Sequence, residues 1–142
     1  MTQRKLEELS PEECMALLGQ CRVGRLVYQD DLGPAAVPVN YGLAGSDIVI
    51  RVEGGAKQAA MEQASLGFEV DHIDDDEHAG WSVLVRGSGH EVPRDLVPQL
   101  LHRVGERFPA PWASGVHNVW LQITPRVVTG RRLGPETTTP LS

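Results

Sequence analysis

The chain has 142 residues, a length that fits one domain with its own hydrophobic core. Its apolar fraction of 41% and charged fraction of 23% are typical of a globular domain and exclude the disordered and fibrous classes. The formal net charge of −6, from 13 basic and 19 acidic side chains, argues against general nucleic-acid binding, which needs a positive field.

The N-terminal residues contain no apolar run of the kind found in signal peptides, and no segment is long and apolar enough to span a membrane. We therefore expect a cytoplasmic protein that binds neither membranes nor nucleic acid. The two cysteines, Cys14 and Cys21, are too few for a disulfide framework and have no obvious partners for zinc. Both are expected to be reduced thiols.

The first predicted element is a short amphipathic helix. Ser10 is a favourable N-cap, Pro11 suits the first helical position, and Glu13 at the third position completes a capping box. Gly19 indicates that this helix ends near Gln20.

The rest of the chain predicts strands at hairpin spacing with two further helices inserted between them. Pro38 removes one backbone donor, which places its strand at a sheet edge or a bulge. The pattern indicates a single α+β domain over residues 1–142, with about six or seven mainly antiparallel strands and three short helices. The predicted strands cover residues 23–28, 36–41, 48–52, 68–73, 81–92, 116–123 and 125–133, the helices 56–64 and 94–107, and a frayed tail begins at about 134.

The segment from Ile50 to Lys57 is a candidate anion site. Arg51 comes at the end of a predicted strand, Gly54 and Gly55 allow close approach of the backbone, and Lys57 lies in the first turn of a predicted helix. The free amide groups and the dipole of a helix N-terminus favour anions, and arginine and lysine both bind phosphate. The alternative is a solvated turn that carries two surface cations.

Five motifs together give the chain a family resemblance that extends from about Ser10 to Leu133. In their order and spacing they resemble the small actinobacterial pyridoxamine 5′-phosphate oxidase-like proteins. The motifs are PVNY at 38–41, IRVEGGAK at 50–57, FEVD at 68–71, GWSVLVRG at 80–87 and TGRR at 129–132.

The resemblance implies a split β-barrel that forms a homodimer and binds a flavin in the groove between its subunits. FMN is the expected cofactor, with a deazaflavin coenzyme or haem as the alternatives. By the resemblance, Arg51 and Lys57 hold the flavin phosphate. The backbone of Val39, Asn40, Tyr41, Ile50, Arg51 and Val52 lies along the ring, and Trp81, Ser82 and Val83 line the same groove, with Trp120 or Arg131 of the partner subunit as further candidates.

Two departures from the family pattern stand out. Val52 occupies a position where many relatives carry Ser or Thr, and the missing hydroxyl removes one hydrogen bond to the phosphate, of about 1.5–3 kcal/mol. The C-terminal substrate-binding extension of the true pyridoxamine phosphate oxidases is also missing, so the family name does not imply oxidation of vitamin B6.

Other constellations in the sequence are weaker. The acidic run that begins at Asp71 has Asp76 and Ser82 where a calcium loop needs Gly and Glu, and it is better read as a solvated loop. The five histidines form no metal-binding pattern, so no metal site is predicted, although any of them is a candidate axial ligand if the chain binds haem.

These observations favour a flavin-dependent oxidoreductase with an unknown small-molecule redox substrate and a reduced nicotinamide as the candidate electron donor. No catalytic acid or base is nominated, because the flavin itself carries the redox chemistry. The alternative is a non-enzymatic split-barrel protein that binds flavin or haem.

Overall fold

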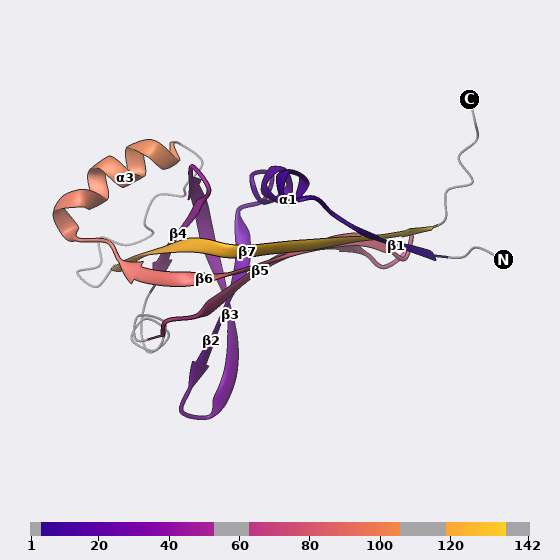
Figure 1. Ribbon diagram of the computed structural model, residues 1–142, viewed down its shortest axis with the longest axis horizontal. Coiled ribbons are helices and arrows are strands. Elements are labelled where there is room, and N and C mark those ends of the chain that lie inside the picture. The colour runs from indigo at the N-terminus through magenta and orange to yellow at the C-terminus, as the bar shows by residue number, and fades with distance from the viewer. Residues whose placement is uncertain (1–3, 53–62, 106–118, 136–142) are drawn as a thin grey trace.

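The computed structural model describes residues 4–52, 63–105 and 119–135 (Figure 1). Within these residues the chain forms seven strands, two α-helices and one turn of 3₁₀ helix. In chain order they are β1 (Arg4–Glu8), α1 (Pro11–Leu18), β2 (Val23–Asp30), β3 (Gly33–Ala44), β4 (Asp47–Val52), β5 (Leu66–Asp74), β6 (Ala79–Glu91), η1 (Arg94–Leu96), α3 (Val97–Val104) and β7 (Val119–Pro135).

The strands form one antiparallel sheet that closes on itself. Their order is β1-β7-β4-β3-β2-β5-β6, and β6 pairs back with β7, so six strands form a ring and β1 lies outside it. Closure removes most exposed edges from the sheet. The predicted α+β fold with a mainly antiparallel split barrel is confirmed. No helix in the described part of the chain has the length and apolar character needed to cross a bilayer.

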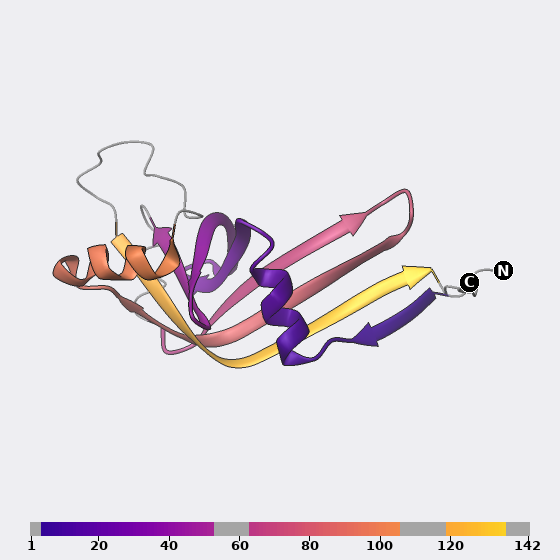
Figure 2. The same cartoon turned by 90° about the horizontal axis from the view of Figure 1, so that it is seen from above.

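The inside of the barrel is filled by alternate side chains of the strands. Phe68 and Tyr41 are the largest of them, and their rings meet edge to face with centroids 4.8 Å apart. Helix α1 lies across the strands (Figure 2) and adds Cys14, Leu17 and Leu18 to the same core. The buried Tyr41 hydroxyl donates a 2.5 Å hydrogen bond to the carbonyl of Leu18, which ties β3 to the end of this helix.

Helix α1 starts as the sequence predicts. The backbone N–H of Glu13 donates to the Ser10 side chain, and the Glu13 carboxylate accepts from the N–H of Ser10 in return. Both bonds satisfy donors that the first helical turn leaves free.

Strand β7 differs from the prediction of two strands separated near Pro125. It is one strand of 17 residues, and its pairing with β6 shifts by one residue between Arg86 and Gly87. Arg126 has no partner across this shift, which is a β-bulge. The bulge reverses the alternation, so Leu121 and Ile123 face the core before it, and the even-numbered Val128 and Gly130 face the core after it.

Helix α3 covers a second, smaller core on the outer face of the sheet. It ends at Val104 rather than at the predicted residue 107. Gly105 follows as its C-cap, with a φ of 83° that favours glycine. Leu96 belongs to the preceding 3₁₀ turn and is 45% exposed. The second core contains Ala44, Val49, Val92, Leu100 and Trp120, with Val97, Leu101 and Val104 packed against it.

Residues 33–40 of β3 form a projecting hairpin with β2 (Figure 1). The N–H of Tyr41 donates to Arg22, so along β3 the N–H groups of odd-numbered residues point to β2 and those of even-numbered residues point away. Pro34 and Pro38 therefore lack their N–H groups on the free side, where no ladder bond is lost. This agrees with the edge position expected for Pro38.

Three further expectations differ from the structure or lie outside it. Strand β1 has no counterpart in the prediction; it pairs with the end of β7, and Gly134, expected in the frayed tail, lies within this ladder. The predicted helix over 56–64 lies almost wholly outside the described residues, and so does the tail from residue 136.

Gly24 provides a test of barrel packing. A Cβ atom at this position would lie 2.9 Å from Cε1 and 3.0 Å from Cε2 of the Phe68 ring, in the centre of the core. We expect Gly24→Ala to lower the free energy of unfolding by about 1–3 kcal/mol, because the ring has no free space to move into. The midpoint of denaturant unfolding measures this effect. Gly134→Ala is the matched control, since nothing lies within 4 Å of its added Cβ, and equal losses in both variants would contradict the packing described.

Candidate functional site

Arg51 lies on the outer face of the barrel near the end of β4. Its neighbours Ile50 and Val52 point into the core, whereas Arg51 shares the outer face with Val49. It pairs across the sheet with Trp120 of β7, which is 8% exposed and belongs to the core under α3. The Nη1 atom of Arg51 is buried and has no hydrogen-bond partner in the described part of the chain.

This buried nitrogen is the strongest chemical signal in the structure. Buried polar groups almost always have hydrogen-bond partners, and a charged donor without one is costly. An oxyanion is the natural partner of a guanidinium group, because its oxygens accept the charged N–H donors directly. The surroundings of Arg51 therefore fit the phosphate of a ligand.

The backbone beside Arg51 offers further polar groups. The ladder between β3 and β4 ends at the pair Tyr41 and Ile50, so the two strands separate beside Asn40 and Arg51. Asn40 has an even number in β3, and its N–H and C=O therefore point away from β2, towards the side of β4. The ladder uses the C=O of Asn40, and its N–H is the backbone group at this point that a ligand can reach.

The structure places the other predicted residues of this segment by their alternation. The side chains of Val39, Tyr41, Ile50 and Val52 face the barrel interior, which leaves only their backbone for contact with a ligand. The prediction assigned a backbone role to these positions. Lys57, the second predicted phosphate ligand, lies outside the described residues.

Trp81, Ser82 and Val83 do not share one surface. Trp81 and Val83 pack on the core of the barrel, and Val83 is fully buried. Ser82 faces outwards and pairs with Arg131 of β7. The two outward residues border an open groove of about 480 Å³, whose lining comprises Glu8, Leu9, Glu69, Ser82, Leu84, Arg86, Val128, Thr129, Gly130 and Arg131.

The two halves of the predicted site lie at opposite ends of β7. Arg51 pairs with Trp120 and Ser82 pairs with Arg131, eleven residues further along the same strand. At about 3.3 Å per residue this is a separation of about 36 Å along β7. Figure 2 shows this strand running from α3 at one end of the molecule to β1 at the other. A single FMN cannot contact both halves within one chain.

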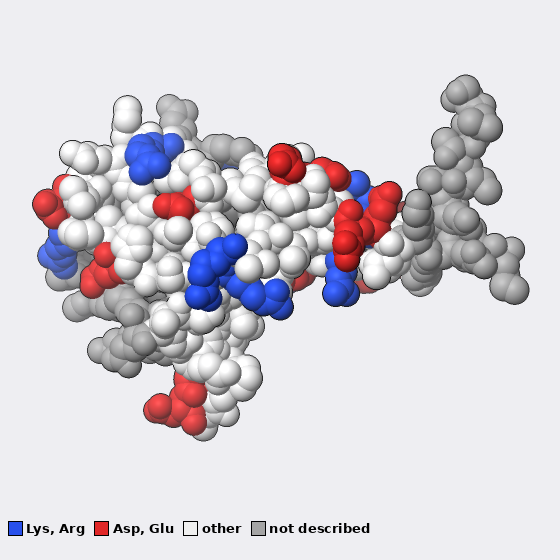
Figure 3. All heavy atoms as spheres, in the orientation of Figure 1, with Lys and Arg blue, Asp and Glu red and all other residues white. Residues whose placement is uncertain are grey.

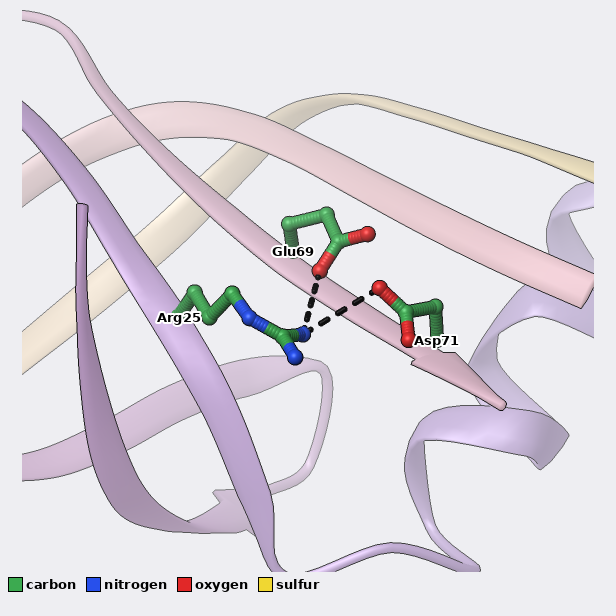
Figure 4. Close-up of polar contacts among 3 residues, drawn as sticks. All are labelled: Arg25, Glu69 and Asp71. Atoms are coloured by element: carbon green, nitrogen blue, oxygen red, sulfur yellow. Dashed lines mark hydrogen bonds and ion pairs between the residues drawn. The ribbon is translucent and has the colours of Figure 1, made fainter. Parts of the chain in front are cut away.

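An ion-pair cluster that the sequence reasoning missed lies on the outer face beside the groove (Figure 4). Arg25 of β2 donates from Nη1 to Oε1 of Glu69 at 3.0 Å and to Oδ2 of Asp71 at 3.1 Å. Burial raises the pKa of Glu69 to about 7, helped by the hydrogen bond and the charge of Asp71 and opposed by Arg25. The signal available in the sequence was the i, i+2 spacing of the two acids in FEVD, which places both on one face of a strand.

The remaining charged groups are dispersed. In Figure 3 the Lys and Arg side chains form separate groups on the face shown, and acidic side chains lie at the tip of the β2–β3 hairpin. In the acidic loop, Asp74 accepts hydrogen bonds from the N–H groups of Asp76 and Glu77 and so builds the turn between β5 and β6. His72, His78, His90 and His102 are exposed, and His117 lies outside the described residues.

The chain is similar to known proteins over most of its length. The family model described as pyridoxamine 5′-phosphate oxidase matches residues 10–132. The uncharacterized protein Rv0080 of Mycobacterium tuberculosis is 30% identical over 143 residues, which cover 96% of this chain and 91% of that protein.

Two solved structures share the fold. The FAD binding protein from Mycobacterium smegmatis is 27% identical with a TM-score of 0.66, over 90% of this chain and 98% of that one. The FAD-binding protein from Mesorhizobium loti is 23% identical with a TM-score of 0.72, over 93% of this chain and 99% of that one. With the matched family sequence and the closed antiparallel barrel both in evidence, this chain belongs to the pyridoxamine 5′-phosphate oxidase family.

Proposed function

We propose that the protein is a flavin-dependent oxidoreductase that works as a homodimer, with the flavin phosphate bound at Arg51. The observation that carries this proposal is the buried Nη1 atom of Arg51, which has no partner among the described residues. A phosphate oxygen at this point supplies the missing acceptor and neutralises the charge. The Mycobacterium smegmatis relative named as an FAD binding protein supports a flavin as the owner of that phosphate.

The flavin ring then lies along the separating ends of β3 and β4. Its pyrimidine edge carries acceptors, and the N–H of Asn40 can donate to one of them. Trp120, beside Arg51, is 8% exposed and offers only a small apolar edge at the same place. These groups bind and orient the ring, and they require no side chain from Val39, Tyr41 or Ile50.

Ser82 and Arg131 complete the pocket from the partner subunit. They lie about 36 Å along β7 from the phosphate site, so the same chain cannot supply them to one flavin. In a twofold dimer, the Arg51 end of one subunit faces the Ser82 end of the other, and two equivalent sites result. This arrangement gives the homodimer a chemical role, because each site is incomplete in the monomer.

When bound, the flavin supplies two-electron redox chemistry. The protein holds the phosphate, orients the ring and limits access of water. A reduced nicotinamide is the proposed electron donor for a small-molecule substrate. Binding residues perform these tasks, and no catalytic acid or base is proposed.

FMN remains the first candidate for the flavin, and FAD joins it because two relatives with this fold are named for FAD. Both carry a phosphate at the end of the ribityl chain, so both can place it at Arg51. Val52 has no hydroxyl group to donate to that phosphate, and its side chain faces the core with 3% exposed. A deazaflavin coenzyme carries the same phosphate and is the third candidate.

Replacement of Arg51 tests the phosphate position. We expect Arg51→Ala to weaken FMN and FAD binding at least tenfold, because one charged hydrogen bond is worth about 1.5–3 kcal/mol. Riboflavin, which has no phosphate, should bind both proteins equally. Quenching of flavin fluorescence during titration measures these affinities.

Arg103→Ala is the matched control, because Arg103 is an exposed arginine near Gly45, at the opposite end of β4. An Arg51→Ala protein with unchanged FMN and FAD affinity would remove the basis of the proposal.

Anaerobic addition of a reduced nicotinamide to the flavin-loaded protein then separates the two classes of function. Loss of flavin absorbance supports the oxidoreductase, and a bound flavin that no donor reduces supports a non-enzymatic binding protein.

A mixed dimer tests whether the site is shared. Arg51→Ala and Ser82→Trp each destroy one half of the proposed pocket, so both homodimers should fail to bind flavin. In the heterodimer, one of the two sites receives an intact Arg51 end and an intact Ser82 end, and binding should recover to about half of the sites. The two chains are co-expressed with different affinity tags, and flavin content is measured on the purified heterodimer. A heterodimer as empty as the parent homodimers would contradict the shared site.

A further inference from the structure

The groove on the outer face of β5, β6 and β7 has the size and lining of a small-molecule site. Its volume of about 480 Å³ lies within the range of about 300–1,000 Å³ that is usual for ligand pockets. Leu84 forms an apolar part of the lining, and Ser82 and Thr129 add hydroxyl groups. Arg86 and Arg131 supply positive charge, and Glu69 supplies a carboxyl group.

The sheet register places the two arginines on either side of Leu84. Glu69, Leu84 and Thr129 form one row across the three strands. Arg86 lies two residues along β6 on one side of this row, and Arg131 lies opposite Ser82 on the other side. Two residues span about 6.6 Å of strand, so long arginine side chains can reach a ligand over Leu84 from both sides. Neither arginine forms an ion pair with any residue that the structure describes.

Glu69 faces this groove with its protonation state set by its neighbours. A single nitrogen of Arg25 bridges Glu69 and Asp71, so one positive charge serves two carboxylates. The burial of Glu69 and the proximity of Asp71 raise its pKa to about 7. Glu69 therefore exchanges its proton near neutral pH, whereas an ordinary glutamate is ionised there.

The other charged groups around Glu69 come from every neighbouring strand. Arg25 lies on β2, Asp71 on β5, Arg86 on β6, Arg131 on β7 and Glu8 on β1. Cys21 lies close enough to Asp71 that this charge, after burial, raises the pKa of its thiol. With Glu69 ionised, three arginines face three carboxylates. Protonation of Glu69 leaves one positive charge in excess and turns its carboxyl group into a hydrogen-bond donor.

We propose that this groove is the substrate site and that it binds an organic oxyanion, a carboxylate or a phosphate, together with one proton taken up at Glu69. The oxyanion lies between Arg86 and Arg131, and the apolar part of the substrate lies on Leu84. The assignment to a substrate rests on the proposed flavin function, because Ser82 and Arg131 also border the flavin pocket of the dimer. The binding of an anion in the groove does not depend on the flavin function.

Benzoate and phenyl phosphate are suitable probes, because each joins an oxyanion to an apolar ring. We expect their dissociation constants to be nearly constant below the pKa of Glu69 and to rise about tenfold per pH unit above it. Glu69→Gln keeps the shape and a donor but cannot ionise, so its affinity should equal that of the wild type at pH 6 and stay constant to pH 8.5. Calorimetry in two buffers with different ionisation enthalpies measures both the affinity and the uptake of protons.

Glu7→Gln is the matched control, because Glu7 of β1 pairs with Arg132 of β7 and does not line the groove, so it should keep the wild-type pH dependence. Arg131→Ala should weaken both probes at every pH. The same pH dependence in Glu69→Gln as in the wild type, or no binding of either probe at pH 6, would overturn the proposal. These measurements use the flavin-free protein, so they stand apart from a failure of flavin binding.

A further arm identifies the source of the anion. FMN and riboflavin are titrated into wild type and Glu69→Gln over the same pH range. The substrate assignment expects neither flavin to show a Glu69-dependent slope. A slope for FMN that riboflavin lacks would show that the groove holds the flavin phosphate, and it would overturn the assignment to a substrate.

The ligand-free protein provides an independent readout of the same carboxyl group. Because folding raises the pKa of Glu69 from 4.5 to about 7, the folded state holds more protons than the unfolded state within that window. The contribution of Glu69 to stability is therefore complete below pH 4.5, is lost as the pH rises to about 7, and stays lost above that. We expect the wild type to lose stability relative to Glu69→Gln from pH 5 to pH 7.5, as urea unfolding at each pH can measure. A constant difference would contradict the shifted titration.

Discussion

The continuous course of β7 through the whole barrel is the constraint on which the rest of the structure depends. Residues 119–123 pair with β4, residues 131–135 pair with β1, and the pairing with β6 extends from residue 121 to residue 133. With uninterrupted alternation over 17 residues, one half of the strand would point its polar side chains into the core and its apolar side chains outwards. The bulge at Arg126 corrects this, so that both halves keep apolar side chains in the core and both present polar side chains outside. Trp120 and Arg131 both face outwards only because of this single extra residue.

Part of this architecture follows from local rules and was predictable. The capping box at Ser10 and the alternation of FEVD depend on neighbouring residues, and the structure contains both. The break expected at Pro125 did not occur, because a proline beside a bulge loses no ladder bond that the strand needs. Strand β1 carries no apolar alternation of its own and exists through pairing with β7, which sequence periodicity cannot reveal.

The candidate site was likewise predictable from the sequence only in part. The motif around Arg51 predicted an anion-binding residue from its type and position, but the burial of Nη1 beside Trp120 depends on pairing across 69 residues. Three consecutive residues, Trp81 to Val83, resembled one lining segment, yet strand alternation sends only the middle one outwards. The cluster of Arg25, Glu69 and Asp71 required knowledge that β2 and β5 are neighbours, and no local pattern contains that information.

The separation of Arg51 from Ser82 is the structural basis of the proposed dimer. Since Arg51 and Ser82 pair with residues at different ends of β7, no rearrangement of a loop brings them together within a chain. Arg51 is half-buried with an unsatisfied nitrogen, and the groove beside Ser82 carries two unpaired arginines among the described residues. Each end alone is an incomplete binding surface with excess donors. A twofold dimer that places the two ends together gives one ligand donors from both sides, and it makes a change at either end of a subunit act on a site shared with its partner.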